Sequence, residues 1–380
     1  MSDAQALYLA ICLLYLSDCI FWVHRHSVAF TSFAGGRWRA VFPSALLGNS
    51  QGGLVLASPF PPLSPVYLSH LWPMSVSPSH VSARVSQTFG SAGGPRQRGL
   101  LVAFKDVRTV EVSGTEVRLN GEFFAKTRGA PQAEWVSDFL VRLLHLTERE
   151  RGKEIKKTLR GAFDVEEAGK KLSAIGERGF GLRVLCNAQF AYLFIVAPAL
   201  VWSYGVLQVI IPIAVGMWLM AAVVAGVCWR LHKSMYPRAG EERVGAAAKM
   251  VLCPPLAVRA TDILASQLLA GYHPLAVAHL LCGRRDFERL AKQVLLDLRY
   301  PMALEPVEEV GGATEEWYRE TLREISEQFV AAHGVDTADL LKPPSQQDTS
   351  SGSFCPRCHA EYAMAAGECS DCPGVHRVAF

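Results

Sequence analysis

The chain has 380 residues, half of them hydrophobic, and its formal net charge is only +3. This much apolar sequence at so low a net charge excludes a disordered chain. The apolar residues are unevenly spread, because residues 184–229 contain no Asp, Glu, Lys, Arg or His. That stretch is far longer than the ~18 apolar residues that mark a membrane span. We therefore do not expect an ordinary soluble globular protein.

The charge is also unevenly placed along the chain. Residues 24–183 carry 22 Lys and Arg against 13 Asp and Glu, a net of +9, whereas residues 230–380 carry 16 against 20, a net of −4. A basic surface next to apolar segments suits anionic lipid headgroups. The basic residues alternate with acidic ones rather than forming a block, which does not favour nucleic acid as a partner.

Residues 4–23 form the first apolar segment and are predicted as a transmembrane helix. A cleaved signal peptide is the alternative, but there is no Lys or Arg before Arg25 to form its basic end. Asp18 lies inside this segment, and an ionisable residue in a span is a functional hypothesis. It also lies near the end of the segment, where its carboxylate can reach the headgroups, so both interpretations stay open.

The long uncharged stretch is predicted to hold two more transmembrane helices, at residues 184–203 and 208–229. The pairs Ala221 with Ala225 and Ala222 with Gly226 would let another helix approach closely, although ordinary alanine content explains them equally well. Basic residues flank all three predicted spans on one side: Arg25, Arg178, Arg183, Arg230 and Lys233. That side is predicted to be cytoplasmic. We expect a multi-pass cell (inner) membrane protein with its N-terminus outside and its soluble domains in the cytoplasm.

Residues 24–147 are predicted to form a β-rich cytoplasmic domain with a capping helix. Short β-type runs occupy residues 28–30, 38–42, 54–56, 100–105, 107–112, 115–119 and 122–126. Asn120-Gly121 between two apolar runs is a strong hairpin signal. An amphipathic helix is predicted at residues 132–146. Strands closed by one such helix resemble the pleckstrin-homology-like modules of bacterial membrane proteins.

The remaining soluble sequence is predicted to be helical. Residues 148–176 read as a basic juxtamembrane helix, lying either on the membrane surface or in solvent. Residues 240–334 read as a helical cytoplasmic domain, with helices at 240–252, 256–270, 274–282, 284–298 and 314–333. Residues 340–353 read as a linker, which should isolate the last segment from the rest of the chain.

The strongest chemical signal lies at residues 354–380. Two C-x-x-C pairs, Cys355 with Cys358 and Cys369 with Cys372, are separated by ten residues. Each pair places two thiolates on one turn, and two facing turns supply the four soft ligands of a tetrahedral zinc site. The segment resembles a zinc ribbon, and this resemblance implies that the four cysteines hold a structural zinc ion.

Other chemical patterns in the sequence are weaker. Residues 48–52 match the nucleophile-elbow pattern G-x-S-x-G, but the chain continues into a predicted strand where the elbow needs a helix. A second group, close together in sequence, could line a pocket or simply cap helices: Asp262, His273, His279, Arg284 and Arg285. Neither a P-loop nor an H-E-x-x-H motif is present in the sequence, so no catalytic residue is predicted.

The sequence thus predicts an α+β multi-domain membrane protein with three transmembrane helices and a zinc-ribbon tail. We expect a non-enzymatic membrane-anchored adaptor, assembly or regulatory protein. A subunit of a membrane transport or enzyme complex is the alternative. The expected partners are the lipid bilayer and a protein held by the ribbon or the helical domain, and homo-oligomerisation stays open.

Overall fold

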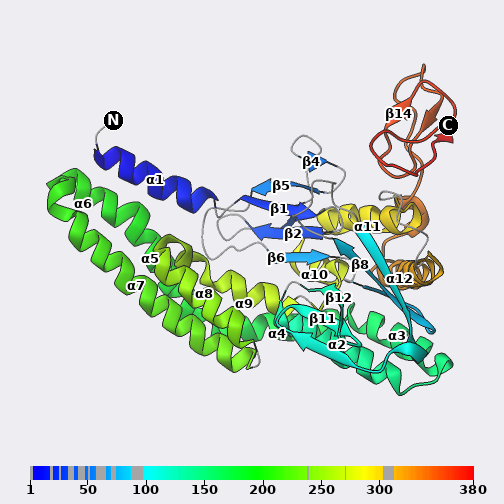
Figure 1. Cartoon of the computed structure of the whole chain (residues 1–380). Helices are drawn as coiled ribbons and strands as arrows, with labels where there is room; N and C mark the ends of the chain where they lie inside the picture. Colours follow the sequence, from blue (N-terminus) through cyan, green and yellow to red (C-terminus); the bar gives the residue numbers. More distant parts are fainter. Residues whose placement is uncertain are drawn as a thin grey trace. The chain divides into compact units, whose positions relative to one another are not determined.

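The computed structural model describes residues 3–17, 20–24, 27–32, 38–41, 48–49, 52–56, 66–69, 74–86, 97–127, 129–237, 239–269, 271–302 and 312–380. The chain forms two compact units (Figure 1). Unit 1 comprises Met1–Ser69, Gly129–Pro131 and Val165–Gly283, and unit 2 comprises His70–Arg128, Gln132–Asp164 and Arg284–Phe380. The units are therefore assembled from alternating stretches of the chain, unlike the consecutive domains that we predicted.

Unit 1 contains two small antiparallel sheets. In the first, β5 (Gly52–Leu56) lies between β1 (Ile20–His24) and β4 (Gly48–Asn49). In the second, β2 (Ser27–Ser32) lies between β3 (Trp38–Val41) and β6 (Val66–Ser69). The strands predicted around residues 28–30, 38–42 and 54–56 are thus present. Their β-branched and aromatic residues suit a half-buried pleated surface.

The first predicted transmembrane helix is wrong. Helix α1 (Asp3–Ser17) has 15 residues, a length of ~22 Å at ~1.5 Å per residue, and the bilayer core is ~30 Å thick. Residues 20–23 of the predicted span belong to β1, which pairs with β5 from Ile20↔Leu56 to His24↔Gly52. Hydropathy does not distinguish a membrane helix from a short helix followed by an apolar strand. Asp18 lies outside the described residues.

The uncharged stretch folds into a helical hairpin. Its first arm is continuous through α5 (Phe180–Ala191), the π-helical turn η2 (Tyr192–Val196) and α6 (Ala197–Tyr204), and its second arm is α7 (Val206–Met235). Gly205 joins them at a φ of 79°, which glycine adopts without strain. The stretches Phe180–Tyr204 and Gln208–Met235 are long and apolar enough to cross a membrane, with mean hydropathies of 1.9 and 2.3.

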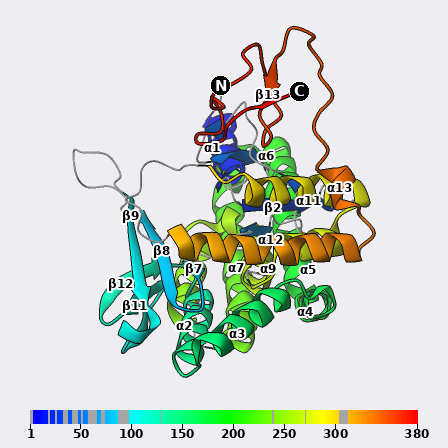
Figure 2. The same ribbon diagram turned by 90° about the vertical axis from the view of Figure 1, so that its right-hand side faces the viewer.

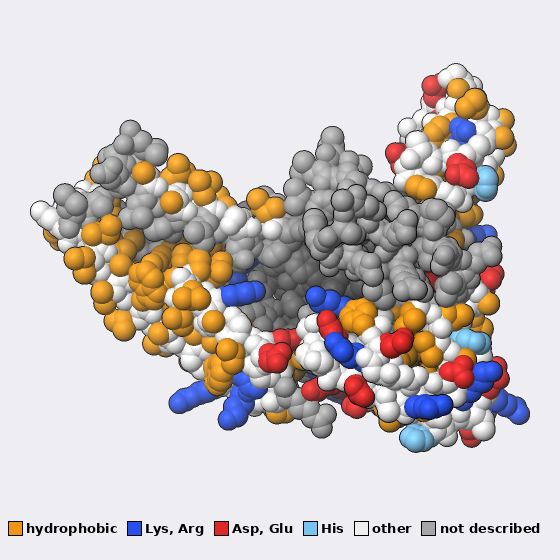
Figure 3. Space-filling view, viewed as in Figure 1, with side chains coloured by type: hydrophobic (Ala, Val, Ile, Leu, Met, Phe, Trp, Pro, Cys, Tyr) orange, Lys and Arg blue, Asp and Glu red, His pale blue; other side chains and the backbone are white. Residues whose placement is uncertain are grey.

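The two arms pack through small and medium side chains near their base. Ala221 and Ala225 of α7 are buried in one cluster with Leu182 and Cys186 of α5. The other small pair, Ala222 and Gly226, is exposed. Many large apolar side chains of the hairpin are also exposed, and hydrophobic groups cover much of the helical part that Figure 3 displays.

Five further helical elements belong to unit 1. After α4 (Val165–Arg178) and the hairpin come α8 (Gly240–Leu252), the 3-10 turn η3 (Pro254–Arg259), α9 (Ala260–Leu269) and α10 (Pro274–Leu281). Helices α8 and α9 run beside α7 in Figure 1. Proline at the first positions of η3 and α10 is tolerated, because the first N–H groups of a helix have no intrahelical partner.

Unit 2 contains two three-stranded antiparallel sheets besides its C-terminal region. The first has the order β7 (Met74–Val76), β8 (His80–Ser86) and β9 (Gln97–Ala103), and the short turn η1 (Phe104–Asp106) follows it. The second has the order β10 (Val110–Ser113), β11 (Glu116–Leu119) and β12 (Glu122–Lys126). Asn120 and Gly121 connect β11 to β12 with φ values of 53° and 82°, so the predicted hairpin and its turn are confirmed.

Helices complete unit 2. Helix α2 (Ala130–Leu144) buries the predicted face that contains Val136, Phe139 and Leu143. The predicted helix over residues 148–176 is instead two helices, α3 (Glu148–Gly161) and α4, of which only α3 belongs to unit 2. Helices α11 (Arg284–Arg299) and α12 (Gly312–Ala332) pack side by side (Figure 2), and the short α13 (Thr337–Leu340) follows them.

Candidate metal centre

The C-terminal cysteines lie on two turns beside a very small sheet. Its three strands have the order β14 (Glu361–Tyr362), β13 (Ser353–Phe354) and β15 (Val378–Ala379). A backbone hydrogen bond from His359 to Cys355, at 2.9 Å, closes the turn that holds Cys355 and Cys358. In the second pair, Val375 donates to Cys372 and its carbonyl accepts the Cys369 N–H, both at 3.0 Å. Because each pair of cysteines is held together by local backbone bonds, both pairs of sulfurs can face a common point.

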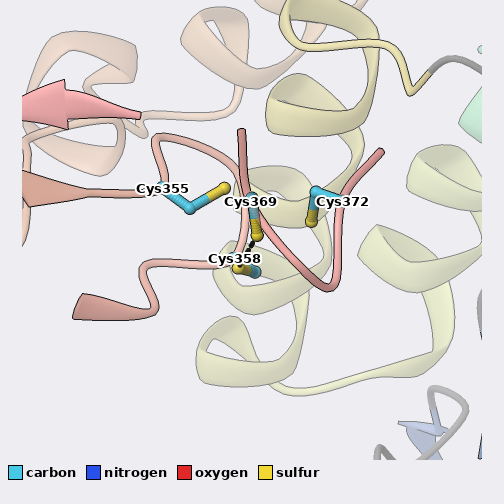
Figure 4. A group of neighbouring side chains, drawn as sticks. All are labelled: Cys355, Cys358, Cys369 and Cys372. Atoms are coloured by element: carbon cyan, nitrogen blue, oxygen red, sulfur yellow. Dashed lines mark hydrogen bonds between the residues drawn. The ribbon is translucent and has the colours of Figure 1, made fainter. Parts of the chain in front are cut away.

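The four sulfurs do converge (Figure 4). The Sγ atoms of Cys355, Cys358, Cys369 and Cys372 all lie within 4.8 Å of one another, and those of Cys358 and Cys369 are 3.5 Å apart. Ligands at ~2.3 Å from a tetrahedral metal ion are separated from one another by slightly less than ~4 Å. The four cysteines are therefore close enough to hold a metal ion.

The surroundings of the sulfurs suit metal ligation. Burial raises the pKa of Cys355 to about 11, although backbone N–H groups of Cys358 and Arg357 bond its sulfur and oppose the rise. The hydrogen bond with Cys372, together with burial, also raises the pKa of Cys358. The Cys355 and Cys358 thiols thus hold their protons in the absence of a cation. A bound metal ion would supply the positive charge that keeps four thiolates together.

An ion pair attaches residues 354–380, the cysteine-rich region, to α11. Arg357, between the first two cysteines, donates from one guanidinium nitrogen to Asp297 Oδ1 at 2.6 Å and from another to the Tyr300 carbonyl at 2.7 Å. The Arg357 and Asp297 side chains are only 4% and 6% exposed. The contact lies at the C-terminal end of α11, where a positive charge also interacts favourably with the helix dipole.

Apolar packing extends the same contact. Met302, which follows α11, is buried in one cluster with Cys355, Cys369, Cys372 and Val375. The predicted linker is also attached, since the Gln347 and Asp348 backbone N–H groups donate to the Glu361 carboxylate at 2.7 and 3.1 Å. The expectation that residues 340–353 isolate the tail is therefore wrong, because linker and tail both have specific partners within unit 2.

The G-x-S-x-G match at residues 48–52 does not form a nucleophile elbow. Gly48 and Asn49 belong to β4, and Gly52 begins β5, which pairs with β4 in antiparallel fashion. Ser50 itself lies outside the described residues. The local order is strand, turn and strand, whereas the elbow requires a helix after the turn.

The group between residues 262 and 285 is divided between the two units. His273 caps α10 by accepting the Leu275 backbone N–H at 3.3 Å. Arg284 belongs to unit 2, where it pairs with Glu288 at 2.7 Å and donates to the Gly334 carbonyl. These partners favour the interpretation of helix capping and surface pairing.

The spacing of the sequence predicts the four cysteines but gives no role to Arg357. Its partner Asp297 is 60 residues away, and the only local signal was an acidic residue on the otherwise apolar face of α11. Comparisons of the chain with protein-family models, with curated proteins and with solved structures find no match.

Proposed function

We propose that the protein is a non-enzymatic membrane-anchored adaptor whose cytoplasmic part includes a structural zinc site. The observation that carries the proposal is the pairing of an apolar helical hairpin with a cluster of four cysteines. Four protein thiolates fill every position of a tetrahedral zinc ion, and such closed sites are structural rather than catalytic. Thiolate sets of this geometry select zinc or iron among the common metals.

The hairpin has the dimensions of two membrane spans. From Trp229 to Val206, α7 extends ~35 Å at ~1.5 Å per residue, slightly more than the ~30 Å hydrocarbon core. Trp202 and Tyr204 are 93% and 61% exposed at the tip of the hairpin, and Trp229 lies at its base. Aromatic residues at both ends of a span are typical of the two membrane interfaces.

The orientation follows from the charges beside the hairpin. Arg178 precedes the hairpin and Arg183 lies in its first turn, and Arg230 and Lys233 follow its uncharged part. The positive-inside rule places both ends in the cytoplasm. With two spans instead of three, the two chain termini lie on the same side, so we now place the N-terminus in the cytoplasm as well.

The adaptor role is supported by the way the cysteine-rich region is held. It is fixed to α11 through a buried ion pair, so it presents a defined surface rather than a mobile tail. A subunit of a membrane transport or enzyme complex is the alternative, and such a subunit would use the same anchor and the same surface.

The anchor is tested with two substitutions on the exposed face of α7. Ile211→Arg combined with Val215→Arg places two charges in the hydrocarbon core of the bilayer. Each charge raises the free energy of membrane insertion by ~2.5–3.5 kcal/mol. Val112→Arg is the matched control, because Val112 is an exposed apolar residue of unit 2. We expect the wild type and the control to resist alkaline carbonate extraction, and the double variant to be lost from the membrane fraction. Extraction of the wild type itself would contradict the anchor.

The adaptor role is tested by co-purification in a mild detergent. We expect a reproducible set of proteins to accompany the full chain, and part of that set to be absent when Cys358 is replaced by serine. Cys282→Ser, which leaves the cluster intact, is the control. An identical set with all three proteins would contradict a partner-binding role for the cysteine-rich region.

A further inference from the structure

The segment from α8 to α9 follows the membrane hairpin and then turns back. Arg243 lies over the Trp229 ring at 5.4 Å, and further along α8 the Val251 carbonyl accepts the Trp218 indole N–H at 2.9 Å. Helix α8 therefore runs antiparallel to α7, from the base of the hairpin to its middle.

Helix α9 returns along the same face of the hairpin. Its first residue, Ala260, lies against Cys228, and the Leu264 carbonyl accepts the Tyr236 hydroxyl at 3.1 Å. The 3-10 turn η3 connects the two helices and packs against α5. The turning point after Leu252 thus lies beside the middle of the hairpin, η3 makes the return to the base, and α9 continues past the base.

The position of this turning point along α7 gives its depth in the bilayer. From Arg230 to Trp218, α7 covers ~18 Å at ~1.5 Å per residue. Half the thickness of the hydrocarbon core is ~15 Å. If Arg230 lies at the cytoplasmic interface, as proposed above, Val251 and Leu252 reach the middle of the bilayer.

We propose that residues 243–260 form a re-entrant segment that enters the bilayer from the cytoplasmic side. The surface at its tip is apolar, because the Leu252 side chain is 80% exposed and Val251 is 42% exposed. Lys249 is the only charged residue from Val244 to Val258, and a single lysine at this depth costs ~2.5–3.5 kcal/mol. The occupant of this surface is therefore the acyl chains of the lipid that surround the hairpin.

The backbone of the segment is satisfied in the way that hydrocarbon requires. Irregular backbone at membrane depth occurs only where protein groups replace water as hydrogen-bond partners. Side chains of α5 and α7 supply four such partners: Trp218 to Val251, Gln189 to Pro254, Cys186 to Ala257 and Cys228 to Ala260. A turn exposed to water would not need donors from the spans.

Gln189 is the most informative of these donors. Its side chain is fully buried, and its Nε2 donates to the Pro254 carbonyl at 2.6 Å. Proline at 254 and 255 interrupts the helical hydrogen-bond pattern at this point. A polar side chain inside an apolar span, aimed at the carbonyl of a helix break, is what a re-entrant turn needs.

The proposal rests on the membrane anchor, and mass tagging in native membranes tests the two separately. Leu252→Cys and Val251→Cys are introduced one at a time into full-length protein carrying Cys253→Ser. Open membrane fragments, with both faces accessible, are treated with a water-soluble maleimide polymer. Lys233→Cys, an exposed position at the base of α7, reports water access, and the parent protein gives the background from native cysteines.

We expect the cysteines at 251 and 252 to react on the order of tenfold or more slowly than that at 233, because a thiol in hydrocarbon does not form the reactive thiolate. All three should react fully after denaturation. If 251 and 252 react as fast as 233 while the protein resists carbonate extraction, the re-entrant segment is refuted and the anchor stands. If carbonate releases the protein, both proposals fail.

Discussion

Cysteines in the two units have opposite roles, and their spacing decides which role they take. In unit 1, Cys186 and Cys228 lie on different helices and each faces a separate backbone carbonyl. In unit 2, four cysteines on two turns bring their sulfurs within 4.8 Å of one another. The first two act as small buried hydrophobes with a weak donor, whereas the four together form a candidate metal site. Burial alone does not distinguish the roles, since Cys186 and Cys228 are as buried as Cys355, Cys369 and Cys372.

Metal removal should give the largest effect in this comparison. Cys358→Ser replaces an exposed cysteine, so it changes little besides the ligand set. Apparent binding free energies of structural zinc are ~10–16 kcal/mol at pH 7, far more than a region of fewer than ~40 residues stabilises by packing. We expect about one zinc ion per wild-type chain by elemental analysis, a large loss in the variant, and rapid proteolysis of residues 354–380.

The control is Cys282→Ser, which should retain the full metal content. Because Met302 and Asp297 contact the cysteine-rich region, metal loss should also raise amide hydrogen exchange at the C-terminal end of α11. Unchanged exchange there, in a variant that has lost its metal, would mean that the two parts are energetically independent.

The ion pair of unit 2 should give the next largest effect. Arg357→Ala leaves Asp297 as a buried carboxylate without its guanidinium partner, and breaking a buried pair in this way costs ~3–5 kcal/mol. We expect a clear drop in the thermal unfolding temperature of unit 2. Hydrogen exchange in the purified full-length protein measures this temperature. Arg323→Ala removes a more exposed arginine that pairs with Glu320 and Glu327, and exposed pairs contribute only ~0–1 kcal/mol.

A double variant separates the charge from the packing. Arg357→Met combined with Asp297→Leu removes both charges and keeps apolar volume, so it should recover much of the lost stability. If Arg357→Ala were no more harmful than Arg323→Ala, the ion pair would not hold the cysteine-rich region in place.

The sequence predicts the cysteine cluster well and its attachment to α11 poorly. The cysteine cluster follows from spacing within 18 residues, since two C-x-x-C turns can place four thiolates together with little help from the rest of the fold. Its attachment does not follow, because the contact between Arg357 and Asp297 depends on how α11 is placed 60 residues earlier. Local sequence patterns therefore predict the metal ligands but not the residues that pack against them.

The same limit explains the errors in the membrane region. The uncharged stretch predicts the hairpin and its turn at Gly205, because composition and length decide that outcome. The first predicted span failed because Ile20–His24 finds a partner strand, Gly52–Leu56, that hydropathy does not register. The return of α8 and α9 along the hairpin was also missed. Both α8 and α9 were predicted as helices, but helical periodicity does not show which element a helix packs against.

Close packing between the arms of the hairpin gives a third test. A Cβ atom added at Gly216 would clash with the Tyr192 hydroxyl oxygen, which donates to the Ile213 carbonyl at 3.2 Å. Gly216→Ala should therefore displace the Tyr192 ring, and overpacking of this kind costs ~1–3 kcal/mol. We expect a lower unfolding temperature in detergent.

The matched control is Gly226→Ala on the same helix, because a Cβ atom there meets nothing within 4 Å. Adding Tyr192→Leu to Gly216→Ala should recover part of the loss by removing the group that clashes. Equal behaviour of the two glycine variants would contradict the close approach of the arms at Gly216.

The smallest expected effect concerns the donor at the helix break. Gln189→Leu keeps the side chain's approximate size but removes the N–H that satisfies the Pro254 carbonyl. Interhelical hydrogen bonds in membranes average ~0.6 kcal/mol and seldom exceed ~2 kcal/mol. We expect a loss of unfolding free energy within this range, together with faster amide exchange confined to residues 250–260, because the turn loses its attachment to α5.

Gln208→Leu is the control, since Gln208 is exposed on α7 and its replacement should leave that exchange unchanged. A stabilised turn in Gln189→Leu would mean that burial of the amide costs more than its hydrogen bond contributes, and the hairpin would then hold the segment by apolar packing alone.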